Sequence, residues 1–274
     1  MIRLAEEPIL ERVMERLMEK HISGTTMSSA LDKAKEANKN SMIASINFLS
    51  ADVTDRSKAR YVMTTYAEMI RRISRFGINA SIQVPLDQIG MKVGRDVAYG
   101  NLSELLKIGN RHGVFVWAEV RDSSESLDEF DDARGFGVAF HDDKAERYLR
   151  EYRGLRAFKI IFREKEYRGK DYYERIAKSV TKGRRSHMTP VLSSLPEKAF
   201  WQLLRSTSSE RNLIFEFRLG YSNSSIKKAL KKGAKLCVFV PFGKDWARYA
   251  MNNVPEGYMR FLAGRLLNEN KPGA

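Results

Sequence analysis

The residues best placed to do chemistry follow two strand-like runs in the last quarter of the sequence. These runs, Leu213–Phe217 and Leu236–Val240, are joined by the helix-like segment Ser224–Lys232. A strand, a helix and a second strand in this order make the two strands parallel, and α/β folds bind ligands at the carboxyl ends of parallel strands. We therefore expect the functional site near Glu216–Tyr221 and Val240–Tyr249.

Histidine and cysteine offer few alternative sites. The four histidines are scattered, and none has a second metal ligand at helical spacing. Of these, only His141 follows a predicted strand closely enough to face a ligand-binding mouth. The single Cys237 lies inside a predicted strand, which excludes a disulfide framework and favours a buried structural thiol over a nucleophile.

Common catalytic motifs are missing from the chain. It contains no GxGxxG, P-loop, HExxH or GxSxG pattern. The acidic run DEFDD at 128–132 is more typical of a solvated helix face than of a metal site. We therefore predict no metal centre, and the residues alone assign no catalytic group.

Length and composition favour one large domain. A chain of 274 residues with 43% hydrophobic content can bury a full core and matches the size of one α/β barrel. No apolar run reaches the roughly 18 to 20 residues of a membrane span. The first twenty residues, MIRLAEEPILERVMERLMEK, have the pattern of a charged amphipathic helix rather than a signal peptide. These features predict a cytoplasmic protein.

The net charge of +14 permits several kinds of partner. Its densest runs are KKALKK at 227–232, KGRR at 182–185 and RRISR at 71–75, and most of the charge is dispersed over predicted helix faces. No zinc-finger or RNA-binding motif accompanies it, which argues against nucleic acid. The remaining readings are solvated faces, a phosphate-bearing cofactor, or docking at the inner face of an anionic membrane.

Strand-like and helix-like segments alternate along the chain. The strand candidates are 42–49, 79–84, 114–120, 137–140, 155–162, 188–192, 213–217 and 236–240. Helical patterns lie between them at 56–76, 96–110, 124–133, 143–152, 170–178, 196–205 and 224–232, and others precede them at 4–20 and 26–39, where Thr25 or Thr26 is a candidate cap. This order predicts a (βα)8 TIM-like barrel at 41–274, with N-terminal helices at 1–40 and a long C-terminal helix. The competing fold, a doubly wound sheet, would usually show a glycine-rich turn after its first strand, and SINFLSADVTD has no glycine.

Several stretches together resemble the proline dehydrogenase family. These are INASIQV, LSELLKIGNRHGVFVWAEVRDS, LRAFKIIFRE, FEFRLGY and VFVPFGKDWARY, in this order. The resemblance covers nearly the whole chain and implies an FAD-dependent barrel. It also implies oxidation of proline or a related cyclic amine, with electrons passing to a quinone or another acceptor.

The resemblance assigns several residues to the cofactor. Arg156 matches the family's flavin-contacting arginine, and Lys159 matches the lysine of a KGAY-type motif whose Gly-Ala is Ile160-Ile161 here. A bulky pair could crowd the close cofactor approach that glycine permits. Glu216 matches the acidic residue of the FEF motif.

Two further cofactor positions and two substrate positions depart from the family pattern. The flavin-contacting glutamine after the fourth strand aligns with His141, and the histidine of the ATH-type turn aligns with Ser194. The second-strand lysine that positions substrate is Gln83, and the third-strand aspartate with which it pairs is Glu119. The family's charge pair is therefore not preserved.

The substrate pocket differs most from the family pattern at the C-terminal helix. Tyr221 and Tyr249 match aromatic residues that line the pocket, but the paired arginines that grip the amino-acid carboxylate are Asn252 and Asn253. Asparagine can hydrogen-bond a carboxylate but supplies no charge to offset its desolvation. Arg248, one helical turn before Asn252, could supply that charge or be an ordinary surface residue. Two readings follow: a flavoenzyme, or a repurposed barrel that has lost the proline site and binds another ligand or partner.

Overall fold

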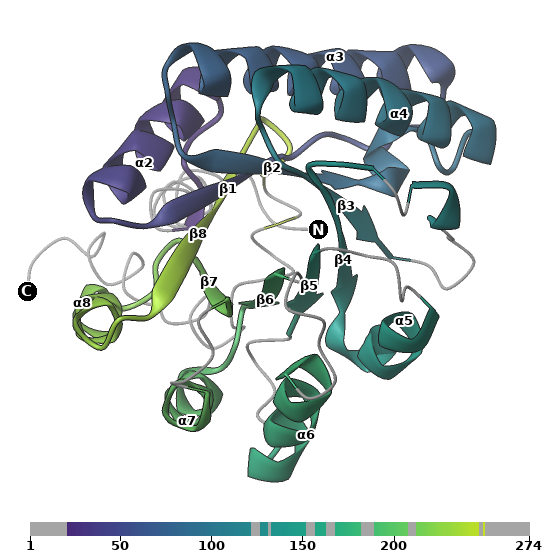
Figure 1. Ribbon diagram of the computed structural model, residues 1–274. Helices are drawn as coiled ribbons and strands as arrows, with labels where there is room; N and C mark the ends of the chain where they lie inside the picture. The colour runs from purple at the N-terminus through teal and green to yellow at the C-terminus, as the bar shows by residue number, and fades with distance from the viewer. Residues whose placement is uncertain are drawn as a thin grey trace, which may run out of the picture.

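Eight parallel strands form a closed barrel in chain order. In this computed structural model the described residues are 21–121, 127–130, 133–151, 157–162, 168–181, 189–207, 212–246 and 249. The strands are β1 (Ile43–Phe48), β2 (Ala80–Pro85), β3 (Val116–Val120), β4 (Phe136–His141), β5 (Ala157–Ile161), β6 (Thr189–Ser193), β7 (Ile214–Arg218) and β8 (Lys235–Phe242). Pairing of β1 with both β2 and β8 closes the ring. The predicted TIM-like barrel is confirmed (Figure 1).

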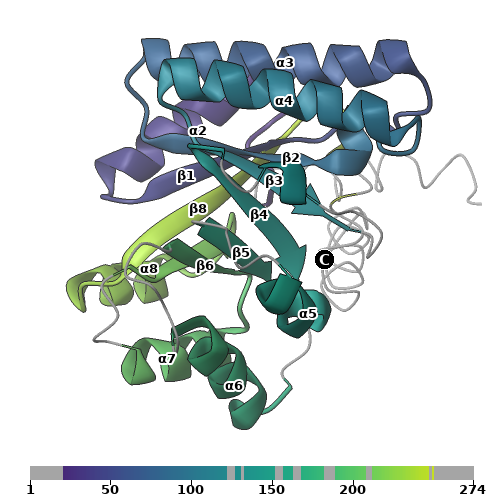
Figure 2. The same ribbon diagram turned by 45° about the vertical axis from the view of Figure 1, so that its right-hand side comes forward.

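Helices surround the barrel, and Figure 2 shows α3 and α4 side by side along one flank. The α-helices are α2 (Met27–Lys39), α3 (Arg56–Arg75), α4 (Arg95–His112), α5 (Ala145–Glu151), α6 (Lys170–Thr181), α7 (Glu197–Ser206) and α8 (Asn223–Lys231). Short 3-10 turns lie at η2 (Leu86–Ile89), η3 (Asp128–Phe130) and η4 (Asp142–Lys144). Where a helix was predicted over 124–133, the described residues form only η3. None of the described helices is long and apolar enough to cross a membrane.

Helix α2 belongs to the predicted N-terminal helical segment. It packs beside β1 and β8, and the Thr26 hydroxyl caps it by accepting a hydrogen bond from the backbone N–H of Ser29. The capping prediction is therefore confirmed for Thr26. The helix predicted over 4–20 lies outside the described residues, and the division at residue 40 stays a prediction.

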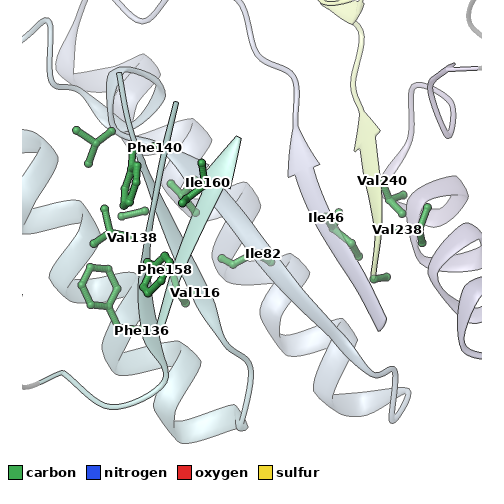
Figure 3. Packing of buried hydrophobic residues seen from close by; sticks show 14 of the residues in the cluster. Ile46, Ile82, Val116, Phe136, Val138, Phe140, Phe158, Ile160, Val238 and Val240 are labelled. Carbon is green, nitrogen blue, oxygen red and sulfur yellow. The ribbon is translucent and has the colours of Figure 1, made fainter. Parts of the chain in front are cut away.

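The outward faces of the strands carry the apolar core. Side chains alternate between the two faces of a strand, so every second residue meets the helices. Figure 3 shows Ile46, Ile82, Val138, Ile160 and Val240 among the buried residues of this layer. The alternation of apolar and polar residues in strands such as IASINF and IFEFR reflects this packing.

The barrel interior differs because much of it is polar. Its amino-terminal end holds an apolar cluster of Trp117, Ala157 and Val191. Gly137 makes room for the indole, since a Cβ atom on Gly137 would lie 2.5 Å from Cζ3 of Trp117. Next to this cluster lies the ammonium of Lys159, 5.0 Å from the indole ring. From this level to the carboxyl ends of the strands, the inward positions are largely polar.

Candidate functional site

Lys159 is at the centre of a buried polar network inside the barrel. Its ammonium donates hydrogen bonds to Glu216 Oε2 at 2.6 Å, Gln83 Oε1 at 2.8 Å and Ser45 Oγ at 3.0 Å. An ammonium has three donors, so these contacts satisfy it completely. The side chain is also fully buried. Lys159 therefore holds its three neighbours together inside the barrel. To contact a ligand directly, it would have to break one of these hydrogen bonds.

Gln83 joins this lysine to a second charged pair nearer the mouth. While its amide oxygen accepts from Lys159, its amide nitrogen donates to Glu119 Oε2 at 2.8 Å. The other oxygen of Glu119 accepts from Arg121 Nε at 2.7 Å, and Arg121 also donates to Asp87 Oδ2 at 3.0 Å. The two partners of Gln83 fix the orientation of its amide.

The environment keeps Glu119 ionised. Burial on its own would raise the pKa of this carboxyl, but the charge of Arg121 and hydrogen bonds from Arg121 and Gln83 outweigh it and hold the pKa below its ordinary value. The pKa of Arg121 is raised mainly by Glu119, with a further contribution from Asp87. The Glu119 carboxylate and the Arg121 guanidinium therefore form an ion pair at the end of β3.

Glu216 anchors the opposite side of the network. Its Oε1 accepts from Ser193 Oγ at 2.7 Å, and its Oε2 accepts from both Lys159 and, at 3.4 Å, the Cys237 thiol. Burial, followed by the charge of Glu216, raises the pKa of Cys237 well above its usual range. The prediction of a buried thiol is confirmed, and the thiol is protonated at neutral pH.

A second arginine marks the mouth at the end of β7. Arg218 Nε donates to Ser194 Oγ at 2.8 Å. Ser194 follows β6 in the left-handed backbone region, at φ 59°, and its N–H donates to the carbonyl of Glu216. Arg218 is in register with Phe239, whose ring lies 6.3 Å from that of Tyr249. Thus the predicted site residues Ser194 and Tyr249 border the same part of the mouth.

His141 closes β4 next to this network. Its Nδ1 is buried and has no hydrogen-bond partner among the described residues. Burial lowers the pKa of its imidazole, although the carboxylates of Glu119 and Asp143 partly oppose this shift. His141 is therefore neutral at pH 7, with a buried polar atom that a bound group could satisfy.

One buried polar group at this position, the imidazole of His141, could contact a bound flavin. The unsatisfied Nδ1 of His141 suits a ring that carries both hydrogen-bond donors and acceptors. Of the two isoleucines that replace Gly-Ala, Ile160 packs into the core between barrel and helices, so its bulk points away from the mouth. Only Ile161, on the other face of β5, can crowd a ligand. Arg156, the predicted flavin-contacting arginine, lies outside the described residues.

Tyr221 lies apart from the other predicted site residues. Its ring stacks on Phe217 at 4.4 Å between centroids, and Phe217 packs against Phe200 of α7 in the helical layer. Tyr221 also lines a groove of about 550 Å³ between α2 and α8, which reaches Arg218 at one end. The described structure therefore places Tyr221 on the outer side of β7. Asn252, Asn253 and Arg248 lie outside the described residues.

Sequence reasoning missed the two arginines of the mouth. In each case an arginine follows a buried glutamate by two positions, as Glu119 and Arg121 on β3 and as Glu216 and Arg218 on β7. Residues two apart share one face of a strand. This repeated spacing was the available signal, because the resemblance had already assigned one glutamate to the substrate and the other to the cofactor.

Comparison with known proteins gives a consistent result, although no family model matches the sequence. The chain is 22% identical over 261 residues to proline dehydrogenase 2 of Bacillus subtilis subsp. natto, a match that covers 86% of this chain and 85% of that protein. It is 24% identical over 259 residues to proline dehydrogenase 1 of Bacillus subtilis (strain 168), with the same coverage. The chain is thus a distant relative of proline dehydrogenases over most of its length.

Solved structures agree on the fold of this proline dehydrogenase relative. It superposes on proline utilization A (PutA) from Bdellovibrio bacteriovorus, inactivated by N-propargylglycine, with a TM-score of 0.71 at 16% identity. For PutA from Corynebacterium freiburgense the TM-score is 0.66 at 10% identity. The matches cover 98% and 100% of this chain but 34% and 36% of those longer chains. The chain thus spans about a third of each PutA protein, and the likeness shows a shared fold.

Proposed function

We propose that this protein is a proline dehydrogenase-like flavoprotein that oxidises proline or a related cyclic amine. One observation carries the proposal. Four polar residues that the resemblance assigned to cofactor or substrate, Gln83, Glu119, Lys159 and Glu216, form one hydrogen-bonded network although they come from four strands. A barrel selected only for stability would fill these inward positions with apolar side chains.

When bound, FAD supplies the two-electron acceptor for a hydride from the carbon next to the amine nitrogen. The nitrogen loses a proton as the C=N bond forms. Within the chain, His141 and Arg156 would hold the flavin, while the ionised Glu119 would favour the cationic form of the amine in the mouth. Deeper in the barrel, the ammonium of Lys159 holds the side chains of Glu216 and Gln83 in place. A quinone or another acceptor would be the final partner for the electrons, and the basic surface suits docking on an anionic membrane.

A second candidate is a non-catalytic barrel that retains the fold and binds another ligand or partner. The observation that favours it is the residue type at Asn252 and Asn253, where the family's arginines grip the carboxylate. Removing one partner from a buried charged contact costs about 2 to 5 kcal/mol. A member without compensation elsewhere would bind proline weakly.

The visible spectrum of the purified protein separates the two candidates. A flavoprotein is yellow as isolated or becomes so after incubation with FAD and removal of the excess. Anaerobic addition of proline, and separately of pyrrolidine, then tests which amine bleaches the flavin band. A protein that stays colourless with FAD would rule out the flavoenzyme.

A further inference from the structure

Helix α8 carries a concentrated positive charge on the outside of the barrel. Lys227, Lys228, Lys231 and the C-cap residue Lys232 are all exposed, and no acidic residue occurs between residues 217 and 244. Within the part of the chain that the structure describes, none of the four lysines forms an ion pair. Like charges four positions apart on a helix repel each other, so this arrangement lowers the stability of α8. Stability alone therefore does not account for it.

Helix α2 shows the opposite arrangement, although it lies close by, on the other side of β8 (Figure 1). Lys33 pairs with Glu36 at 2.7 Å, and Lys35 pairs with Asp32 at 3.3 Å. Most of the positive charge of α2 is thus offset within the helix. The charge of α8 remains available to an anionic partner.

An apolar groove of about 550 Å³ runs between the two helices. Its lining includes the apolar side chains of Met42, Ile226, Leu230 and Val238, and the exposed Lys227 also lines it. A phospholipid combines an anionic headgroup with hydrocarbon chains, and this surface combines uncompensated lysines with an apolar groove. A nucleic acid would match the charge but has no hydrocarbon chain for the groove.

We propose that α8 and the groove beside it form the face with which the protein docks on an anionic membrane. This inference rests on the proposed function, because it names the surface for the membrane contact proposed there. The lipid phosphates would contact the lysines of α8, and an acyl chain would enter the groove. One end of the groove reaches Arg218 at the end of β7, so a bilayer docked here would lie beside the barrel mouth. A membrane-borne electron acceptor could then approach the mouth directly.

The test is co-sedimentation of the full-length protein with lipid vesicles. One set of vesicles contains phosphatidylglycerol and phosphatidylcholine in equal amounts, and the other contains phosphatidylcholine alone. We expect the protein to bind the anionic vesicles and not the neutral ones. Each lysine near an anionic surface contributes about 1 kcal/mol, so Lys227→Gln combined with Lys231→Gln should weaken binding roughly thirtyfold.

Two matched double variants make the result specific to α8. Lys107→Gln combined with Arg111→Gln removes the same charge from α4, at exposed residues that also have no ion pair among the described residues. This variant should bind the anionic vesicles like the wild type. Lys227→Arg combined with Lys231→Arg keeps the charge and should also retain binding, which guards against a folding defect in the glutamine variant.

A third variant tests the groove without changing the charge. Ile226→Gln places a polar side chain in the groove, and we expect it to weaken vesicle binding roughly fivefold. Unchanged binding by this variant would overturn the role of the groove. The docking face as a whole is overturned if the wild type does not prefer anionic vesicles, or if the α4 variant weakens binding as much as the α8 variant. It is also overturned if a single-stranded RNA oligonucleotide binds more tightly than the anionic vesicles and depends on the same lysines.

The colour of the protein distinguishes failure of this inference from failure of the proposed function. A yellow protein that does not bind anionic vesicles defeats the docking face and leaves the flavoenzyme standing. A colourless protein that binds them through Lys227 and Lys231 supports the docking face and defeats the flavoenzyme.

Discussion

The Nζ atom of Lys159 lies 2.6 Å from Oε2 of Glu216 inside the barrel, although the two residues are 57 positions apart in the chain. Their side chains are 0% and 1% exposed. A buried ion pair is tolerated only when further hydrogen bonds satisfy both partners. The surrounding hydroxyl, amide and thiol groups meet that requirement. The stability of the buried pair therefore depends on all of these hydrogen bonds.

Breaking this pair should destabilise the fold strongly. Lys159→Met leaves the carboxylate of Glu216 buried without a countercharge, and we expect a loss of about 3 to 5 kcal/mol in the free energy of unfolding. Urea denaturation followed by circular dichroism measures it. The matched control is Lys33→Met, which removes an exposed pair with Glu36 at 2.7 Å and should cost at most about 1 kcal/mol. Equal losses in the two variants would contradict a special role for the interior pair.

Gly137 should not tolerate a side chain. In Gly137→Ala the new Cβ meets the indole of Trp117 at 2.5 Å, and we expect a loss of about 1 to 3 kcal/mol in stability. Gly100 in α4 is the control, because a Cβ there meets no atom within 4 Å. Gly100→Ala should gain about 0.5 to 1 kcal/mol from helix propensity. Thermal denaturation should therefore shift in opposite directions for the two variants.

The stability of the protein should depend on pH through His141. Burial lowers the pKa of this imidazole in the folded protein, so the unfolded chain binds more protons as the pH falls through its own pKa of about 6.5. This contribution is fully present above pH 6.5 and is lost as the pH falls through the folded pKa. His141→Gln should flatten that part of a plot of unfolding free energy against pH. An unchanged slope would show that the histidine is not the group responsible.

The thiol of Cys237 should be unreactive in the native protein. It is buried, and its raised pKa leaves almost no thiolate at pH 8. Ellman's reagent should therefore label native protein very slowly and urea-unfolded protein at once. Because the chain has a single cysteine, the absorbance change reports this residue alone. Rapid labelling under native conditions would mean that the interior network opens readily.

Much of the fold could be predicted from the sequence. Eight apolar runs separated by amphipathic segments predicted the strand count, because every strand of a barrel must bury one face against helices. Glu119 and Glu216, which the resemblance assigned to substrate and cofactor, are both buried in the barrel, and their roles stay predictions. A short acidic stretch near residue 128 was less informative, because solvated helices and turns share that composition.

The sequence by itself determined the barrel, the resemblance to proline dehydrogenases and the residue types available to the site. Only the tertiary structure decided how those residues are used. It directed Tyr221 outward to stack on Phe217, surrounded Lys159 with three acceptors from β1, β2 and β7, and brought Arg121 and Arg218 to the mouth. The physical reason is that a hydrogen bond requires two groups within about 3 Å. Strand register and barrel closure set such distances between residues far apart in the chain.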